Sequence, residues 1–315
     1  MTDLSQNLID VSFILTTMNR SIILKENILN IISKLKKFTF QWEIIVAIDC
    51  KDSQISGDDF YFDERIKIVY SKISGASNTR NIAIKNCSGR ILFFLQDDVF
   101  PQGDCIQRHL EFHRKFPELF FVFQGIVVYP ANEKNNFMDW LEIGLQNNFK
   151  TFSTGFLSEK LRWEAANSSV KKDFIIKNHM FFKEDYFVFE NLDLEIQMKK
   201  NGARIYFDSE AISYHHHIIN NPEEYRNRMI AIANFEFNYW NFYVKDNPDL
   251  KKYVAQPNPK IIRTLIKLLF YLFSFAAHIL NLKVILHIFW NLKMEMFKVI
   301  ALENIERKNN EFKSK

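Results

Sequence analysis

An apolar run that ends abruptly in two carboxylates is the feature of this sequence that most constrains its fold. Residues 91–95 read Ile-Leu-Phe-Phe-Leu, and Gln96, Asp97 and Asp98 follow them directly. A short apolar run bounded by a glycine and a proline is typical of a fully buried strand in a parallel sheet. Ligands of open α/β sheets bind just beyond the carboxyl ends of such strands. We therefore expect Asp97 and Asp98 at a ligand site, where carboxylates suit Mg²⁺ or Mn²⁺, although an isolated pair would also fit a solvated turn.

Length, charge and cysteine usage define the class of protein. A chain of 315 residues can bury a large core, in one large domain or in one domain with an appendage. Its 41 basic and 37 acidic residues nearly balance, so electrostatics alone give no reason to expect nucleic-acid binding. The three widely spaced cysteines form no zinc or disulfide pattern, which favours a reducing compartment. Because the polar first ten residues lack the apolar core of a secretion signal, we expect a cytoplasmic protein.

Apolar runs alternate with segments of helical periodicity over the first hundred residues. Strands are predicted at 11–15, 42–48, 66–70 and 91–95, and helices at 22–35 and up to about 87. Such alternation predicts a parallel, doubly wound sheet. Polar residues at or after the strand ends are Thr16, Arg20, Asp49, Asn78, Arg80, Gln96 and Asp97. Because the carboxyl ends of parallel strands meet at one edge, we expect these residues to form a nucleotide-binding rim.

Two of these rim residues have specific expected roles. Asp49 ends a run too apolar to be exposed, so its carboxylate could accept a hydrogen bond from a uracil imide or a ribose hydroxyl. Arg80 lies on a helix that begins after Gly75, so its guanidinium and the first backbone amides would face a diphosphate. The ordinary alternatives are a turn cap and a surface cation. No G-x-G-x-x-G or G-x-x-x-x-G-K loop is present, which weighs against a dinucleotide cofactor or a P-loop.

Seven segments together resemble a known family. They are 13–20 (FILTTMNR), 43–49 (EIIVAID), 75–83 (GASNTRNIA), 93–98 (FFLQDD), 166–172 (ANSSVKK), 189–196 (FENLDLEI) and 211–217 (AISYHHH). In this order they resemble family 2 glycosyltransferases of the GT-A fold, over roughly residues 10 to 245. The segment at 166 is similar to the acceptor-side Asn-x-Ser of the family, the one at 189 to its Glu-Asp-x-Asp/Glu-Leu helix, and the one at 211 to its closing strand and histidines.

The resemblance implies a fold and an activity. The fold is an α/β GT-A domain with a Rossmann-like, mostly parallel sheet over 1–220, whose donor half covers about 1–100 and whose acceptor half covers about 101–220. The activity is metal-dependent, inverting transfer of a sugar from a nucleotide-diphosphate donor, most often a UDP-sugar, to a hydroxyl of a glycan or lipid-linked acceptor in surface polysaccharide synthesis. The expected acceptor-binding residues are Trp163, Asn167 and Ser169. The expected metal ligands are Asp98 and His215.

Two departures from the family pattern affect the expected catalytic residues. Gln96 holds the first position of the usual Asp-x-Asp metal motif, and Asn191 replaces an aspartate. We expect Asp193 to be the catalytic base and Glu190, one helical turn away, to be the second candidate, although acidic residues in a first helical turn can simply complement the helix dipole. The departures leave open a degenerate, scaffold-like relative. A sugar nucleotidyltransferase is a weaker alternative, because residues 16–20 are not the Gly-rich loop that it would need.

The C-terminal part is expected to be helical and separate from catalysis. We expect a helical extension over 221–256 and amphipathic or hydrophobic helices over 257–315. The uncharged stretch 268–282 is short of the roughly 20 residues that span a bilayer. The basic residues that recur among apolar ones are Arg263, Lys267, Lys283, Lys293 and Lys298. This pattern fits a helix lying on an anionic membrane through residues 261–300, while a helical hairpin packed on protein, including a second subunit of an oligomer, remains the alternative.

Overall fold

The chain forms two compact units. The structure is a computed structural model that describes residues 9–56, 60, 62–133, 135–146, 152–157, 163–184, 186, 188–217, 219, 222–239, 258–280 and 283–313. The first unit comprises Met1–Glu133 and Glu142–His217, and the second comprises Lys134–Leu141 and Ile218–Lys315. Much of the predicted extension, from 240 to 257, lies outside the described residues.

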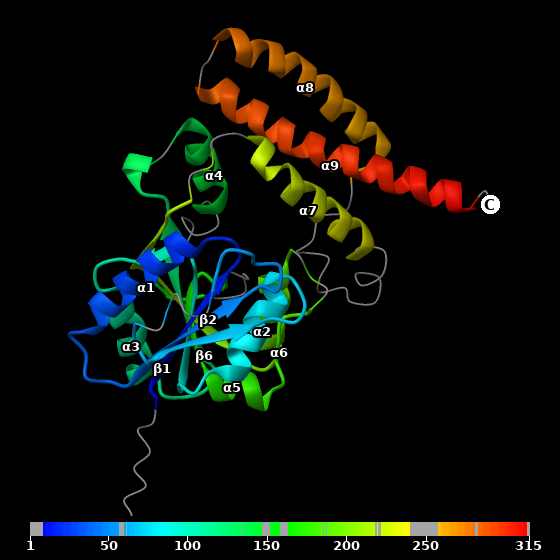
Figure 1. The fold of residues 1–315 in the computed structure, drawn as a ribbon. Helices are drawn as coiled ribbons and strands as arrows, with labels where there is room; N and C mark the ends of the chain where they lie inside the picture. The colour runs from blue at the N-terminus through cyan, green and yellow to red at the C-terminus, as the bar shows by residue number, and fades with distance from the viewer. Residues whose placement is uncertain are drawn as a thin grey trace, which may run out of the picture. The chain divides into compact units, whose positions relative to one another are not determined.

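A single mixed sheet organises the described part of the first unit (Figure 1). Its strands are β1 (Val11–Thr17), β2 (Trp42–Ile48), β3 (Ile66–Tyr70), β4 (Ile91–Gln96), β5 (Val99–Pro101), β6 (Phe121–Val128), β7 (Gly155–Phe156), β8 (Asn167–Lys171) and β9 (Arg204–His215). They lie in the order β3-β2-β1-β4-β8-β6-β9-β5, with β7 paired to β9. Strands β3, β2, β1 and β4 are mutually parallel, β6 is parallel to β9, and β8, β5 and β7 run antiparallel to their neighbours. The predicted mostly parallel sheet is confirmed.

Helices cover both faces of this sheet (Figure 1). They are α1 (Ser21–Leu35), α2 (Ala76–Asn86), α3 (Cys105–Lys115), α5 (Lys172–Lys177) and α6 (Glu190–Lys200). The short helix η2 (Ala131–Glu133) follows β6, and α4 (Asn136–Gln146) begins in the second unit. Alternate residues of β1 point to opposite faces: Phe13 packs in the core that includes α1 and α3, whereas Ile14 packs in the core that includes α2, α5 and α6. Because both faces are buried, the central strands are continuous apolar runs.

The second unit is helical. Its elements are η3 (Pro222–Tyr225), α7 (Arg226–Tyr239), α8 (Lys260–Leu280) and α9 (Lys283–Lys313). Ala301 and Leu302 of α9 pack on Ala233 of α7, and Val299 of α9 packs on Ile266 of α8. No helix in the described ranges has both the length and the apolar character that a bilayer crossing requires.

Ion pairs within the second unit correct one expectation about its basic residues. Arg263 forms a bidentate ion pair with Glu306, with Nη2–Oε1 and Nη1–Oε2 distances of 2.7 and 3.0 Å. Lys267 Nζ lies 2.7 Å from Glu303 Oε1. Two further cations of α9 are also paired: Lys293 with Glu223, and Lys298 with Glu236. These side chains are turned toward carboxylates of neighbouring elements, because a cation packed between helices needs a counter-charge. These four cations therefore do not form the expected basic face for anionic lipid, and the side chain of Lys283, the fifth expected member, lies outside the described residues.

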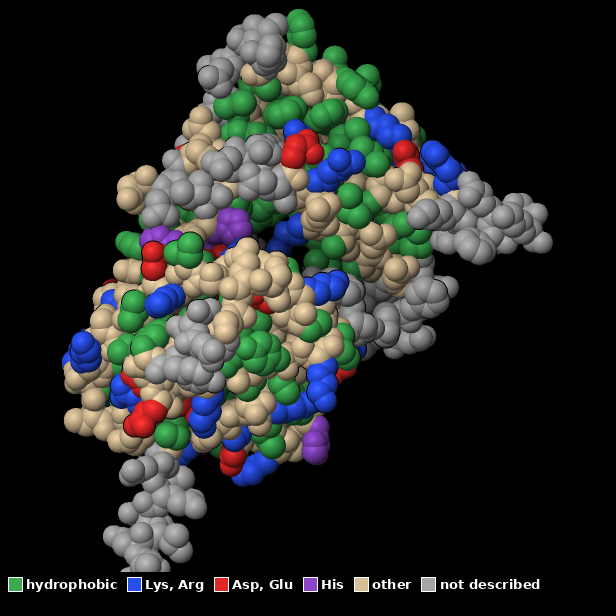
Figure 2. All heavy atoms as spheres, in the orientation of Figure 1, with side chains coloured by type: hydrophobic (Ala, Val, Ile, Leu, Met, Phe, Trp, Pro, Cys, Tyr) green, Lys and Arg blue, Asp and Glu red, His purple; other side chains and the backbone are tan. Residues whose placement is uncertain are grey.

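The outward surface of α8 is apolar instead. Its exposed large hydrophobic residues are Ile261, Ile262, Leu265, Leu268, Leu269, Tyr271, Leu272 and Phe275. Several recur at a spacing of three or four residues, which places them along one side of the helix. Figure 2 shows hydrophobic side chains gathered over this part of the second unit.

Candidate functional site

A cavity of about 390 Å³ opens at the carboxyl ends of β1, β2 and β4. Six of the seven residues predicted to bind a nucleotide line it: Thr16, Arg20, Asp49, Arg80, Gln96 and Asp97. These residues come from four separate segments, and the parallel register of β1 with β2 and β4 brings them together. We call this space the rim cavity. Its volume is in the range of small-molecule sites.

Asp49 organises the loop that leads into α2. Its Oδ2 accepts hydrogen bonds from the Gly75 backbone N–H at 2.7 Å and from the Ser74 hydroxyl at 3.2 Å, and its Oδ1 accepts one from the Lys51 backbone N–H at 2.9 Å. Gly75 has φ +126°, a conformation open to glycine but strained for other residues. Burial tends to raise the pKa of Asp49, but these hydrogen bonds outweigh it and lower the pKa. Asp49 is therefore an ionised acceptor facing the rim cavity.

Polar side chains of α2 fasten it to the segment that precedes α6. Asn81 donates to the Phe182 carbonyl at 2.7 Å and accepts from the Phe182 backbone N–H at 3.0 Å. Asn78, the seventh predicted nucleotide-binding residue, donates to the Glu184 carbonyl at 3.1 Å and does not line the rim cavity. The structure thus gives Asn78 a positioning contact in place of the expected ligand contact.

Arg80 connects the rim cavity to the predicted catalytic helix. Its Nη1 lies 2.9 Å from Glu190 Oε1 at the start of α6, and its guanidinium lies over the Phe182 ring at 5.3 Å from the centroid. The other predicted acid, Asp193, accepts from the Gln197 amide at 2.6 Å and lies 3.2 Å from Lys183 Nζ. Both carboxylates are therefore ion-paired, and Glu190 is the one paired with a residue that lines the rim cavity.

A second group of charged side chains lies beside the rim cavity, around Asp98. Strand β5 pairs antiparallel with β9, with Val99 opposite His215, and the His216 backbone N–H donates to the Asp98 carbonyl at 2.8 Å. As a result, His215 Nε2 and His217 Nδ1 each lie 3.3 Å from Asp98 Oδ2. We call Asp98, His215 and His217 the Asp–His cluster.

Arg20 joins the Asp–His cluster to the rim cavity. Its guanidinium hydrogen-bonds to Asp98, lies 3.2 Å from Asp97 Oδ1 and lies 3.0 Å from His217 Nδ1. Burial tends to raise the pKa of Asp98, but the hydrogen bonds from the two histidines and the Arg20 charge outweigh it and lower the pKa. Burial, followed by repulsion from Asp98, raises the pKa of Asp97 to about 6. The two adjacent carboxylates therefore differ in basicity, and Asp98 is the firmly ionised one.

The Asp–His cluster fits a divalent cation. Asp98 is only 1% exposed, and its Oδ1 has no hydrogen-bond partner among the described residues, so a buried anionic oxygen is free to coordinate. The ligating atoms of the three side chains all lie within 4.8 Å of one another, and a carboxylate with two imidazoles suits Mn²⁺. His217 was not among the predicted ligands. The sequence signal that could have found it is strand alternation, which places residues two apart, such as His215 and His217, on the same side of a strand. The pairing of β5 with β9 is what brings both histidines to Asp98.

The three residues expected to bind an acceptor lie in the interior. Trp163 is 2% exposed and packs against Phe94 and Phe182. Asn167 and Ser169 are fully buried on β8, which runs between β4 and β6 in the middle of the sheet. The expectation of acceptor contact is corrected here, because in the described part of the chain neighbouring side chains enclose Trp163, and helices cover both sides of β8.

Asn167 and Ser169 instead belong to a buried polar network with α3. Asn167 donates to the carbonyls of Ile126 and Ala211, at 3.0 and 2.8 Å, and its Oδ1 lies 3.1 Å from His109 Nε2. Ser169 Oγ lies 2.8 Å from both His109 Nδ1 and His113 Nε2. Burial lowers the pKa of His109 to about 3 and that of His113 well below its usual value, so both imidazoles are neutral. The network therefore joins β8 to α3 and to the neighbouring strands inside the first unit.

Comparisons with known proteins agree with this architecture. The sequence profile described as "Glycosyl transferase family 2" matches residues 12–174, more than half of the chain. A crystal structure of S. aureus TarS is similar with a TM-score of 0.51 and 18% identity, covering 73% of this chain and 40% of that one. This chain thus spans about 40% of that TarS chain. A structure of TarS 1–349 in complex with UDP is similar with a TM-score of 0.50 and 15% identity, covering 95% and 92% of the two chains. A search of curated protein sequences found no significant match.

Proposed function

This chain belongs to glycosyl transferase family 2, and we propose that it moves a sugar from a nucleotide-diphosphate donor to a hydroxyl of a glycan or lipid-linked acceptor, inverting the anomeric centre. The observation that carries the proposal is the junction at Arg20, where the rim cavity meets the Asp–His cluster. A polar cavity can hold the nucleoside, and an adjoining site for a divalent cation can balance the charge of the diphosphate. The remaining assignments follow from the chemistry of this junction.

We propose a uridine nucleotide as the donor. The TarS structure of similar fold was solved in complex with UDP, and Asp49 presents an ionised acceptor to the rim cavity. A carboxylate there can accept a hydrogen bond from the uracil imide or from a ribose hydroxyl. Thr16 and Gln96, at matching positions of β1 and β4, provide neutral polar groups along the same wall.

Arg20 and Arg80 are proposed to bind the diphosphate. Both guanidiniums line the rim cavity, and each can donate two parallel hydrogen bonds to phosphate oxygens. When bound at the Asp–His cluster, Mn²⁺ or Mg²⁺ would offset the negative charge that develops on the departing diphosphate. Asp98, His215 and His217 would hold it, and Arg20 would have to turn from Asp98 toward the phosphates.

Asp193 is the proposed general base. As the acceptor oxygen attacks the anomeric carbon and the carbon–oxygen bond to the diphosphate breaks, the hydroxyl proton passes to this carboxylate. Its partners are the Lys183 ammonium and the Gln197 amide. Glu190 is proposed to orient Arg80, its ion-pair partner. We expect Asp193→Asn to lower kcat with little change in donor KM, whereas Glu190→Gln should mainly raise donor KM. The opposite pattern would make Glu190 the base.

A titration of UDP in the presence and absence of Mn²⁺ tests the site. We expect Mn²⁺ to tighten UDP binding about tenfold or more, equivalent to ~1.4 kcal/mol or more, and Asp98→Asn to abolish this gain. Asp104→Asn is the matched control, because Asp104 is an exposed carboxylate paired with Arg108 outside the site. UDP binding that ignores both Mn²⁺ and Asp98→Asn would refute the metal-dependent proposal. UDP binding without sugar transfer would favour a scaffold-like relative.

We also propose that the enzyme works in the cytoplasm, on surface polysaccharide precursors, with the outward face of α8 resting on a membrane. The support is the exposed apolar row on a 21-residue helix whose sequence contains no acidic residue, so nothing on it repels anionic headgroups. We expect Leu268→Asp with Phe275→Asp to abolish co-sedimentation with anionic vesicles. Ile22→Asp is the control, because Ile22 is exposed on the first unit. Self-association of the wild-type chain through α8 without vesicle binding would contradict the membrane assignment.

A further inference from the structure

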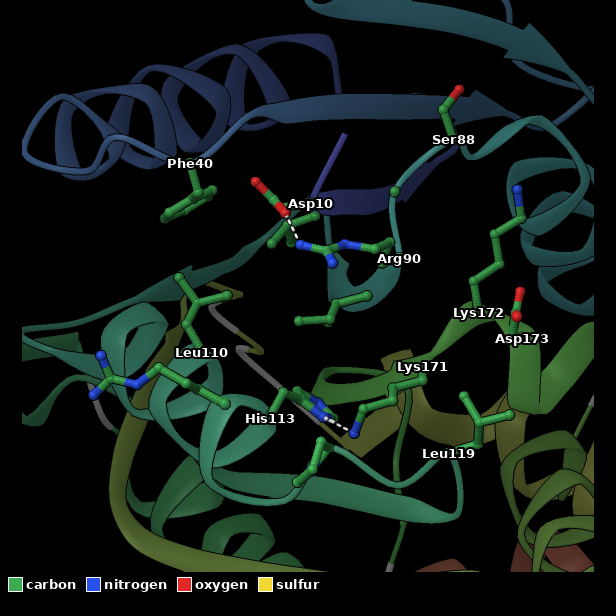
Figure 3. Close-up of a pocket in the computed structure, with 15 residues that line it drawn as sticks. Asp10, Phe40, Ser88, Arg90, Leu110, His113, Leu119, Lys171, Lys172 and Asp173 are labelled. Atoms are coloured by element: carbon green, nitrogen blue, oxygen red, sulfur yellow. Dashed lines mark hydrogen bonds and ion pairs between the residues drawn. The ribbon is translucent and has the colours of Figure 1, made fainter. Parts of the chain in front are cut away.

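A larger cavity, of about 680 Å³, lies at the other edge of the sheet (Figure 3). It is lined by the first residues of β1 and β4, Val11 and Ile91, and by Lys171 at the end of β8. Because β8 runs antiparallel to β4, Lys171 sits opposite Ile91, at the amino ends of the parallel strands. The rim cavity lies at their carboxyl ends, so the two cavities are distinct. We call this one the amino-edge cavity.

The lining combines apolar side chains with unbalanced positive charge. Phe40, Leu110 and Leu119 contribute apolar surface. The four cationic residues of the lining are Arg90, Arg114, Lys171 and Lys172, and the two acidic ones are Asp10 and Asp173. Both carboxylates already have cationic partners, because Asp10 pairs with Arg90 and Asp173 lies 2.9 Å from Lys177. No carboxylate is left for the other three cations of the lining.

Lys171 is the cation for which this imbalance matters most. Its side chain is partly buried, and within the described residues its ammonium has no ion-pair partner within 4 Å. Among those residues, the only carboxylate charge that acts on it is that of Glu118, from beyond ion-pair distance and outside the lining. Lys171 Nζ donates to the Phe116 carbonyl at 2.7 Å. It also lies 3.2 Å from His113 Nδ1, as Figure 3 shows. An ammonium group has three donors, so one remains. Burial lowers the pKa of Lys171 to about 8, which leaves it mostly protonated at neutral pH.

The neighbouring cations are likewise bound only to neutral groups or to none. Lys172 donates to the Cys87 carbonyl at 2.5 Å, and Arg114 is exposed at the cavity wall and has no ion-pair partner in the described part of the chain. A half-buried cation without a counter-ion is energetically unfavourable, and an anion in the cavity would remove that cost. The apolar wall would at the same time bury the carbon skeleton of such an anion.

We propose that the amino-edge cavity is a second binding site, which takes an organic anion with an apolar body, such as an aryl or alkyl phosphate or carboxylate. The volume is in the range of small-molecule sites. Lys171 binds the anionic group, Arg114 contacts it from the rim, and Leu110 and Leu119 pack on the apolar body. The site is independent of the proposed sugar transfer, because none of its lining residues lines the rim cavity.

Isothermal titration of four probes tests the proposal: phenyl phosphate, benzoate, inorganic phosphate and benzyl alcohol. We expect saturable binding of phenyl phosphate or benzoate, and whichever binds more tightly identifies the anionic group. Inorganic phosphate lacks the apolar body and benzyl alcohol lacks the charge, so both should bind at least about tenfold more weakly, as expected for the loss of a charged hydrogen bond or of buried apolar area. Equal binding of either partial probe would overturn the proposal, as would no binding of any probe.

Three variants locate the site. Lys171→Met keeps most of the unbranched side chain but removes its charge, and should weaken binding of the best probe at least about tenfold. Arg114→Gln changes an exposed residue without risk to folding and should weaken it severalfold. Lys200→Met is the matched control, because Lys200 is exposed at the end of α6 and does not line the cavity, and it should leave binding unchanged. Unchanged affinity in both Lys171→Met and Arg114→Gln, or displacement of the probe by UDP, would overturn the assignment.

Discussion

Replacing Ser169 by alanine should destabilise the first unit substantially, although the hydroxyl is small. Ser169 Oγ is fully buried and lies 2.8 Å from one nitrogen of His109 and 2.8 Å from one of His113. Each hydrogen bond contributes roughly 1 to 1.5 kcal/mol net, and an unpaired buried imidazole nitrogen costs at least as much. The sum for two bonds is about 2 to 3 kcal/mol. For a unit of this size that corresponds to a melting-temperature decrease of about 4 to 12 °C.

The neighbouring residue provides a matched control. Ser168 is equally buried on the same strand, but its Oγ has no hydrogen-bond partner in the described structure. Ser168→Ala removes an unsatisfied hydroxyl, so it should be neutral or slightly stabilising. The free energy of unfolding can be measured for both variants by urea titration at pH 7.5, followed by tryptophan fluorescence, with equal m-values as the check on two-state behaviour.

Two results would refute this reasoning. Equal effects of Ser169→Ala and Ser168→Ala would mean that the histidine contacts contribute little. A Ser169→Ala enzyme of unchanged stability but with a raised acceptor KM would return Ser169 to the acceptor-binding role that the sequence predicted.

Three further predictions follow from charged and titratable groups. Burial lowers the pKa of His109 to about 3 and that of His113 well below 6.5, so below pH 6.5 the unfolded chain binds protons that the folded chain does not. The contribution of these two histidines to stability should be constant at and above pH 7 and fall as the pH drops below about 6.5, by up to ~1.4 kcal/mol per pH unit for each histidine. Urea titrations at pH 7.5, 6.0 and 5.0 check this, and a flat profile would contradict it. Lys171→Met should raise the melting temperature of the unliganded protein in differential scanning calorimetry, since it removes a half-buried cation that has no counter-ion within 4 Å. A lower melting temperature would show that the Phe116 and His113 contacts of Lys171 stabilise the protein more than its buried charge destabilises it. Arg20→Gln should tighten Mn²⁺ binding, measured by titration calorimetry, because the guanidinium no longer competes for Asp98. The same variant should bind UDP more weakly. Weaker Mn²⁺ binding would mean that Arg20 helps to build the cation site.

Local sequence pattern was sufficient for the elements of the first hundred residues and for most of the residues that line the rim cavity. The strands at 42–48 and 66–70 have the predicted bounds, and the first helix begins one residue earlier than predicted. Because parallel strands end at one edge of a sheet, seven polar residues were expected to lie together there, and six of them line the rim cavity. These predictions succeed because the period of apolar residues records which element forms and which faces it buries.

What only the tertiary structure decided is the partner that each polar side chain meets. His217 reaches Asp98 because β5 pairs with β9, and Arg263 faces Glu306, 43 residues further along the chain, instead of a lipid headgroup. Asn167 and Ser169 matched a ligand-binding motif, yet β8 lies between two covered faces, so their hydrogen bonds turn inward to α3 and neighbouring strands. Spacing within a segment determines the direction of a side chain relative to its own backbone. The partner that the side chain contacts comes from a distant segment of the chain, and the position of that partner depends on how the helices and the sheet pack together.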